Sequence, residues 1–162
     1  MNLVLFMDEE KIALIAPCGI NCGVCMAYLA YTKGVTEQQG VSYCSGCLVR
    51  NKNCAFIKKN CSARIGKDIQ YCFQDPDFPC EKLQSLDDRY RRDYNISPIE
   101  NLKVMRDLGT DAFIEQQEQV FKCEKCGGTK SVHNGFCYDC EKDQIQAYVT
   151  QKKTSLRKLK QR

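Results

Sequence analysis

The sequence predicts a small α+β protein whose fold is stapled by metal ions rather than by a large apolar core. Three observations lead to this prediction. The chain of 162 residues contains thirteen cysteines and no tryptophan. Its apolar fraction is 43% with the cysteines and about 35% without them, against roughly 45–50% in ordinary globular proteins. The cysteines also recur in C-x2-C spacings, which are typical of metal sites.

The energies involved favour metal as the main source of stability. A structural zinc ion contributes about 10–16 kcal/mol of apparent binding free energy at neutral pH. A whole domain is stable by only about 5–15 kcal/mol. Two to three zinc ions would therefore replace the missing core.

The cysteine count and the start of the chain indicate a reducing cytoplasm. Thirteen is an odd number, so disulfide pairing alone cannot use every thiol. In a reducing compartment, dense cysteine indicates metal more often than disulfide. The start lacks the basic region and cleavage site of a secretory signal. Its apolar run before Asp8 is too short for a membrane span, which needs about 20 residues, so no membrane partner is expected.

The chain divides by composition into four expected regions. These are a loop-rich cysteine-rich module with short helices over 12–85, a helical connector over 86–120, a four-cysteine zinc-ribbon-like β knuckle over 121–143, and a basic tail over 144–162. Apolar runs near the start are candidates for edge strands. Residues 24–33 predict a helix that Gly34 ends.

The connector region carries clear helix signals. Residues 81–94 form an amphipathic pattern. Ser97 and Pro98 provide an N-cap and a proline at the first helical position, and Gly109 ends this second helix. A third helix is expected over 111–120. We interpret these helices as packing elements.

The most specific metal signal lies near the C-terminus. Two C-x2-C pairs follow one another, Cys123 with Cys126 and Cys137 with Cys140. Each pair can form a knuckle in which backbone N–H groups point at thiolate, and Gly127 and Gly128 can supply the positive φ of the turn. Four thiolates form a closed tetrahedral zinc site. His133 lies inside this loop, and because the ligand set is full without it, we expect it to serve as a hydrogen-bonding residue.

The nine upstream cysteines allow two partitions. In the first, one zinc ion is held by Cys22, Cys25, Cys44 and Cys47 and a second by Cys54, Cys61, Cys72 and Cys80, which leaves Cys18 over. In the rival partition, Cys18, Cys22 and Cys25 form a three-thiolate set. Its C-x3-C-x2-C spacing is that of radical S-adenosylmethionine enzymes, but their β/α barrel needs about 200 residues. A plain iron–sulfur cluster stays the alternative cofactor.

Several segments resemble a known family. APCGINCGVCMAYLAY, CSGC and FPCEKL are similar to the cysteine-rich bacterial and archaeal family catalogued as domain of unknown function 3795, which is presumed to bind zinc. The resemblance covers about residues 12–85, and the segments around 90–109 and 123–140 resemble an extension that many members carry. Asp75 stands where the resemblance implies a cysteine. A carboxylate can bind zinc but suits an iron–sulfur cluster poorly, so Asp75 as a ligand favours zinc.

Three functions are compatible with these features. The first is a non-catalytic zinc protein that presents a surface to an unknown protein partner, because the sequence has no paired-carboxylate motif, no phosphate-binding glycine loop and a single histidine. The second is nucleic-acid binding, since residues 121–162 hold ten basic and four acidic side chains. The third is an iron–sulfur redox protein that uses Cys18, Cys22 and Cys25.

Overall fold

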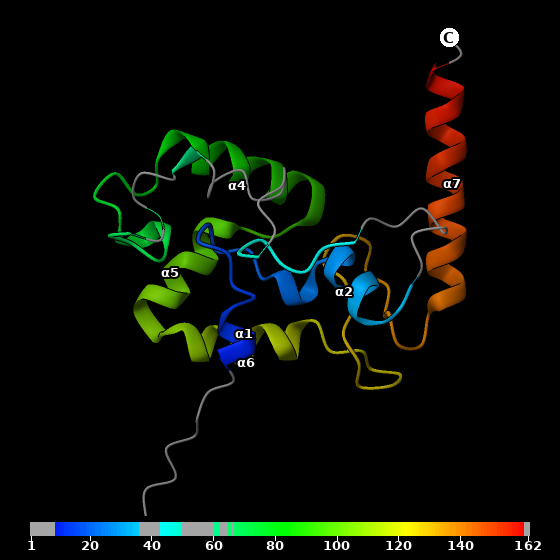
Figure 1. Ribbon diagram of the computed structural model, residues 1–162, viewed down its shortest axis with the longest axis horizontal. Helices are drawn as coiled ribbons and strands as arrows, with labels where there is room; N and C mark the ends of the chain where they lie inside the picture. The colour runs from blue at the N-terminus through cyan, green and yellow to red at the C-terminus, as the bar shows by residue number, and fades with distance from the viewer. Residues whose placement is uncertain (1–8, 36–42, 50–59, 62–64, 66, 161–162) are drawn as a thin grey trace, which may run out of the picture. The chain divides into compact units, whose positions relative to one another are not determined.

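The computed structural model describes residues 9–35, 43–49, 60–61, 65 and 67–160, with side chains up to residue 151. The described part of the chain is mainly helical (Figure 1). It forms two compact units, each built from two separate stretches of sequence. Unit 1 comprises Met1–Gly23 and Gly46–Val120, and unit 2 comprises Val24–Ser45 and Phe121–Arg162.

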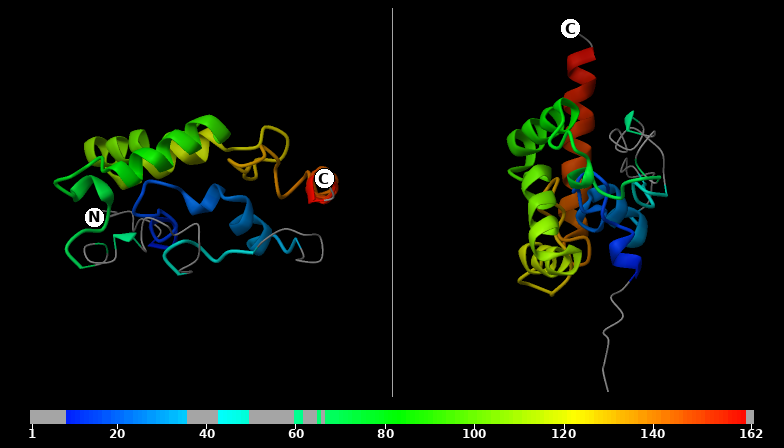
Figure 2. Two further views of the ribbon diagram at one scale, coloured as in Figure 1. Left: turned by 90° about the horizontal axis from the view of Figure 1, so that it is seen from above. Right: turned by 90° about the vertical axis from the view of Figure 1, so that its left-hand side faces the viewer.

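Unit 1 is a helical layer over a cysteine-rich core. Its elements are α1 (Glu9–Ile12), η4 (Cys72–Gln74), α4 (Glu81–Tyr94), α5 (Pro98–Leu108) and α6 (Thr110–Val120). Helix α5 packs against both α4 and α6, and α1 packs against α6 (Figures 1 and 2). Leu83, Leu102 and Phe113 are fully buried at the centre. Four cysteines are buried in the same core: Cys18, Cys22, Cys47 and Cys72.

The helices of unit 1 begin and end near the residues that the sequence predicts. Ser97 is the N-cap of α5, and its hydroxyl accepts a hydrogen bond of 3.0 Å from the N–H of Glu100. Gly109 follows α5 with φ +92°. Val104 packs against the core whereas Leu108 is exposed, because α5 turns its last residue outward.

The turn that carries Cys18 is held by α5. The apolar run that contains Ile15 is one of the candidate edge strands, but its backbone forms a single bridge from Ile15 to Asn21 and turns tightly between them. Gly19 has φ +84°, and a Cβ there would lie 2.5 Å from the carbonyl oxygen of Pro98. A side chain at this position would therefore push the turn away from α5.

Unit 2 contains α2 (Met26–Thr32) and α7 (Lys142–Lys160), and η1 (Cys22–Val24) runs from the last two residues of the first stretch of unit 1 to the first residue of unit 2. Its core consists of Leu29, Ala30, Val35, Tyr138 and Ile145. The basic composition of the last residues predicts only a tail, whereas the structure has a helix of 19 residues there. Ile145 is 1% exposed, so the first turn of α7 is packed into unit 2.

The β part of the expected α+β fold is not found among the described residues. They form no sheet and contain isolated bridges, two of which lie in the expected β knuckle, at Lys122–Thr129 and Lys130–Cys137. The turn after Cys123 explains why no ladder grows. Its backbone N–H groups point at sulfur atoms, so they cannot extend strand pairing.

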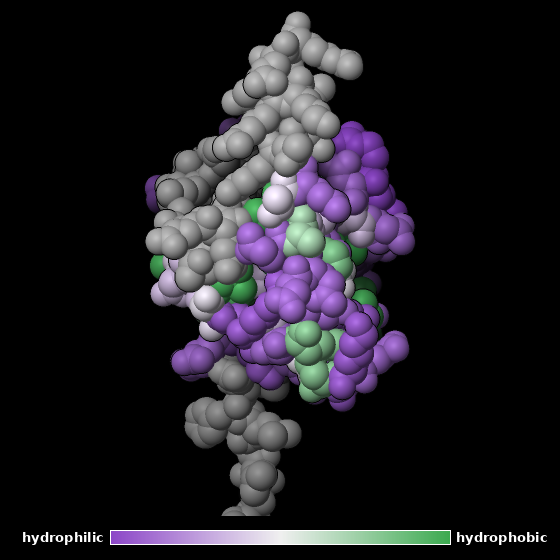
Figure 3. Space-filling model, turned by 90° about the vertical axis from the view of Figure 1, so that its right-hand side faces the viewer, coloured by the Kyte–Doolittle hydropathy of each residue, from purple (hydrophilic) through white to green (hydrophobic). Residues whose placement is uncertain are grey.

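One face of the molecule is drawn in Figure 3. Among its described residues, hydrophilic side chains predominate, with small apolar areas between them. Within the described ranges, no helix combines the length and the apolar character that crossing a bilayer requires.

A buried carboxylate joins α4 to the start of α5. Asp87 is 4% exposed and accepts hydrogen bonds from the Ser97 hydroxyl (2.6 Å), the Ile99 N–H (2.9 Å) and Arg91 Nε (2.5 Å). Burial acts to raise the pKa of Asp87, but these donors outweigh it and lower the pKa below its ordinary value. The ionised carboxylate is thus the form that stabilises the helix pair.

We expect Asp87→Ala to lower the free energy of unfolding by about 3 kcal/mol, because it removes hydrogen bonds to a charged group and leaves buried donors unsatisfied. Asp88→Ala, one residue further on the exposed face, is the matched control and should change it by less than about 0.5 kcal/mol. Urea denaturation of the metal-loaded chain measures both.

The contribution of Asp87 to the free energy of unfolding should decrease as the pH falls. Because the folded pKa of Asp87 is lowered, its contribution is fully present above the unfolded pKa of about 3.9 and is lost as the pH falls through the folded value. The difference between the Asp87→Ala and Asp88→Ala variants should shrink below about pH 4. Equal stability of these variants at pH 7 would contradict the assignment.

Candidate metal centre

The clearest candidate site lies in the loop segment of unit 2 that precedes α7. The sulfur atoms of Cys123, Cys126, Cys137 and Cys140 all lie within 4.8 Å of one another. The Sγ atoms of Cys123 and Cys140 are 3.7 Å apart, and those of Cys126 and Cys137 are 3.5 Å apart. Such a set could hold a metal ion.

The two C-x2-C pairs have the same local geometry. The Sγ of Cys123 accepts hydrogen bonds from the backbone of Lys125 and Cys126. The Sγ of Cys137 accepts them from the backbone of Asp139 and Cys140. Both pairs therefore turn their N–H groups toward sulfur, as the spacing predicts.

The two glycines after Cys126 have different roles. Gly127 has φ +76° and makes the turn, as expected. Gly128 does not have a positive φ; its N–H donates to the Sγ of Cys126 at 3.4 Å. A Cβ on Gly128 would lie 2.3 Å from Oδ2 of Asp139, so a larger residue there would displace the Asp139 side chain.

Three of the four thiols have pKa values that are shifted in different directions. Hydrogen bonds from the backbone of Cys126 and Lys125 lower the pKa of Cys123 to about 7. The hydrogen bond with Cys126, followed by burial, raises the pKa of Cys140, and burial raises that of Cys137. Four sulfurs this close cannot all be ionised unless a cation lies among them.

Glu141 bonds to both knuckles, a role for which no residue was expected from the sequence. Its Oε2 accepts a 2.9 Å hydrogen bond from the N–H of Cys137, and its Oε1 lies 2.6 Å from Nζ of Lys125. The hydrogen bond from Cys137 and then the one from Lys125 lower the pKa of Glu141. The sequence signal that could have identified this role is the position of Glu141 directly after Cys140, the last cysteine.

His133 has the hydrogen-bonding role that the sequence analysis assigned to it. Its Nδ1 accepts a 3.3 Å hydrogen bond from the N–H of Met26, the first residue of α2. That N–H is one of those that a helix leaves without an internal acceptor. Nδ1 must be unprotonated to accept it.

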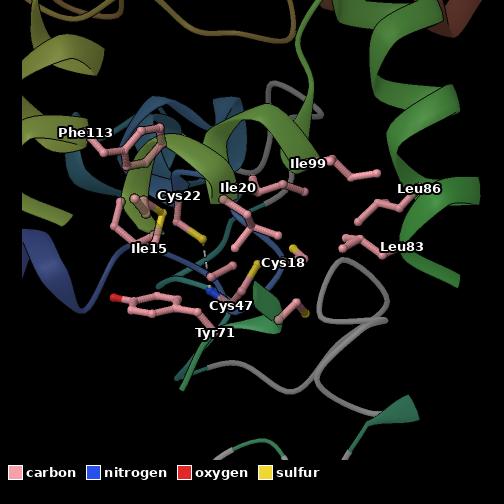
Figure 4. Packing of buried hydrophobic residues seen from close by; sticks show 14 of the residues in the cluster. Ile15, Cys18, Ile20, Cys22, Cys47, Tyr71, Leu83, Leu86, Ile99 and Phe113 are labelled. Atoms are coloured by element: carbon pink, nitrogen blue, oxygen red, sulfur yellow. Dashed lines mark hydrogen bonds between the residues drawn. The ribbon is translucent and has the colours of Figure 1, made fainter. Parts of the chain in front are cut away.

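The first zinc set expected among the upstream cysteines is divided between the two units. Cys22 and Cys47 belong to unit 1, and Cys25 and Cys44 belong to unit 2. In unit 1 the N–H of Cys47 donates to the Sγ of Cys22 at 3.3 Å, drawn as a dashed line in Figure 4. In unit 2 Cys25 is the N-cap of α2, and the N–H of Cys44 donates to the carbonyl of Ala27 at 3.1 Å.

The other expected ligands belong to unit 1, apart from one that lies outside the described residues. Cys61, Cys72, Asp75 and Cys80 line one small cavity. Cys18 packs in the same core (Figure 4). Cys54 falls in the range that the structure does not describe.

The two groups of cysteines differ in how closely they gather. Among the described residues, the C-terminal four alone have all their ligand atoms within 4.8 Å of one another. No disulfide joins any two of the cysteines that the structure describes.

Comparison with known proteins supports the family resemblance. The model of the family described as "Protein of unknown function (DUF3795)" matches residues 14–85, close to the 12–85 expected from the sequence. The extension over residues 86–162 lies outside this match. No curated protein matches the chain. No solved structure matches it.

We expect His133→Ala to leave the metal content unchanged and to lower the free energy of unfolding by about 1 kcal/mol, the usual cost of losing a helix cap. His133→Asn, which retains a side-chain acceptor, is the control and should restore part of the loss. Elemental analysis and urea denaturation measure the two effects. Loss of one metal ion per chain from His133→Ala would contradict the assignment.

Proposed function

We propose that this chain, whose residues 14–85 carry the family domain, is a zinc-binding protein with a non-catalytic role. In this proposal Cys123, Cys126, Cys137 and Cys140 hold one structural zinc ion. The ion stabilises unit 2, which then presents its surface to a protein partner. The proposal takes its support from the geometry of these four sulfurs.

The distances between the sulfurs favour a single tetrahedral ion. A Zn–S bond of about 2.3 Å implies sulfur atoms about 3.8 Å apart along each edge of a tetrahedron. Two of the sulfur pairs are 3.7 and 3.5 Å apart. Four thiolates leave no open position for a substrate, which favours a structural rather than a catalytic ion.

The same distances disfavour an iron–sulfur cluster at this site. Such a cluster is larger than a single ion and binds its cysteines through more than one iron atom, so the four sulfurs would lie further apart than those of a mononuclear site. A single iron ion would accept the same spacing, since thiolates suit both metals. Colour and elemental analysis separate these cases.

We expect the anaerobically purified chain to be colourless and to contain zinc in stoichiometric amount. Cys126→Ser should remove one ion per chain, because it deletes one of the four thiolates that complete the ligand set. Cys126 is exposed, so the substitution should not disturb the core. Ser131→Ala, in the same loop but outside the ligand set, is the control for unit 2 and should keep the ion. Elemental analysis with absorbance near roughly 400 nm is the measurement, and a brown protein containing iron would sink the zinc assignment.

Nucleic-acid binding is a second candidate function, favoured by the form of the C-terminal residues. Residues 142–160 are helical, and the helix is packed into unit 2 at Ile145. The basic residues of its second half and of the two residues that follow are Lys152, Lys153, Arg157, Lys158, Lys160 and Arg162. A basic helix mounted on a metal-stabilised loop suits binding to phosphates.

In this second proposal, binding to single-stranded RNA should weaken with salt. Deleting residues 150–162 removes six basic residues, so the slope of log K against log salt should fall in magnitude by up to about 4. A chain of full length with these six residues replaced by glutamine is the control for loss of the helix itself. Filter binding at several salt concentrations measures the slope, and absent or salt-independent binding would rule the function out.

A further inference from the structure

We propose that Cys18, Cys61, Cys72 and Cys80 form a second metal site, in unit 1, for a thiophilic divalent cation such as zinc. This inference rests on the proposed function, in which cysteine thiolates bind metal, and names a ligand set that neither partition of the sequence contains. It takes Cys18 as a ligand in place of Cys54.

The first step is the placement of Cys18 beside Cys72. The N–H of Cys72 donates a 2.9 Å hydrogen bond to the carbonyl of Pro17. On the other side of Cys18, the carbonyl of Gly19 accepts a 2.9 Å hydrogen bond from Nδ2 of Asn101. The turn is thereby tied to η4 and to α5, and both cysteines are buried in one core.

The second step is a cavity of ion size beside Cys72. It measures about 20 Å³, and Cys61, Cys72, Asp75, Asp77 and Cys80 line it together with apolar side chains. A space of about 10–15 Å³ already accommodates a water molecule, so this one has room for one bare ion. Three thiols facing so small a space are a donor set that a soft cation prefers.

The elements around the cavity fix one of its cysteines and leave an entry for a cation. Cys80 is the N-cap of α4, a helix of 14 residues, so the start of this helix sets its position in the cavity wall. A wider hollow, open to solvent, adjoins the cavity and is lined by Asp75, Asp77 and Glu81 against a single Lys82. These carboxylates would attract an entering cation.

The electrostatic neighbours of Cys72 are the same residues. Burial raises the pKa of the Cys72 thiol, and the negative charges of Cys18, Cys61, Cys80 and Asp75 raise it further. A dication among them would turn their mutual repulsion into attraction.

Asp75 is better placed as a turn residue than as one of the four ligands. Its Oδ1 accepts a 3.0 Å hydrogen bond from the N–H of Asp77, which fixes the turn between η4 and α4. Among the described residues, no three of the sulfurs of this site lie within 4.8 Å of one another, in contrast to the C-terminal set. Metal binding must therefore draw them together around the cavity.

The test compares metal content in serine variants of the full chain, purified anaerobically and reloaded with Zn²⁺. We expect Cys18→Ser and Cys72→Ser each to lose one ion per chain relative to wild type. Cys54→Ser is the matched control, and it should keep the wild-type content. A loss in Cys54→Ser without a loss in Cys18→Ser would overturn the proposal in favour of the sequence partition, as would unchanged content in Cys72→Ser.

A variant of the other site separates this inference from the proposed function. Cys126→Ser should lose one ion while retaining the ion of unit 1. If Cys126→Ser keeps the wild-type content while Cys72→Ser loses an ion, the C-terminal assignment fails and the second site stands. The reverse result leaves the proposed function intact and removes the second site.

A measurement on the wild-type chain covers the case in which a core variant does not fold, which far-ultraviolet circular dichroism reports. The chain is loaded with ¹¹³Cd²⁺, and couplings between cadmium and cysteine β protons identify the ligands. One cadmium signal should couple to Cys18, Cys61, Cys72 and Cys80. Coupling to Cys54 instead of Cys18, or the absence of any signal coupled to Cys72, would overturn the proposal.

Discussion

Repulsion between four closely spaced sulfurs is the constraint on which unit 2 depends. In unit 2, backbone N–H groups point at Cys123 and Cys137 and offset part of the charge of four sulfurs that lie within 4.8 Å. Full ionisation still requires a cation. Because the apolar core of unit 2 is small, the free energy of metal binding would supply much of its stability. Metal binding and folding are then one process rather than two.

The helices of unit 1 could be predicted because their signals are local. Ser97, Pro98 and Gly109 act within one or two turns of the helix that they begin or end, so the sequence carries the information in adjacent positions. Two other elements could not be predicted this way. Helix α7 depends on the burial of Ile145 in the core of unit 2. In place of the expected β knuckle the chain forms turns whose N–H groups donate hydrogen bonds to sulfur.

The same distinction applies to the sites. The C-terminal set was evident from two C-x2-C pairs, since a knuckle is made by neighbouring residues. The partition of the upstream cysteines depends on contacts that no spacing encodes. The hydrogen bond from Cys72 to Pro17 brings Cys18 next to a residue 54 positions away, and α5 holds the turn in place through Gly19. Cys18 therefore looks spare in the sequence although it lies in the core.

The discontinuity of unit 2 has a consequence during synthesis. Its first stretch ends at Ser45 and its second begins at Phe121. At about 5–20 residues per second, a ribosome needs roughly 4–15 s to add the residues between them. During that interval the nascent chain carries α2 without Tyr138 and Ile145, the residues that bury its apolar face. Premature termination before residue 121 would thus release a product with exposed apolar surface and unprotected thiols, a substrate for chaperones and proteases.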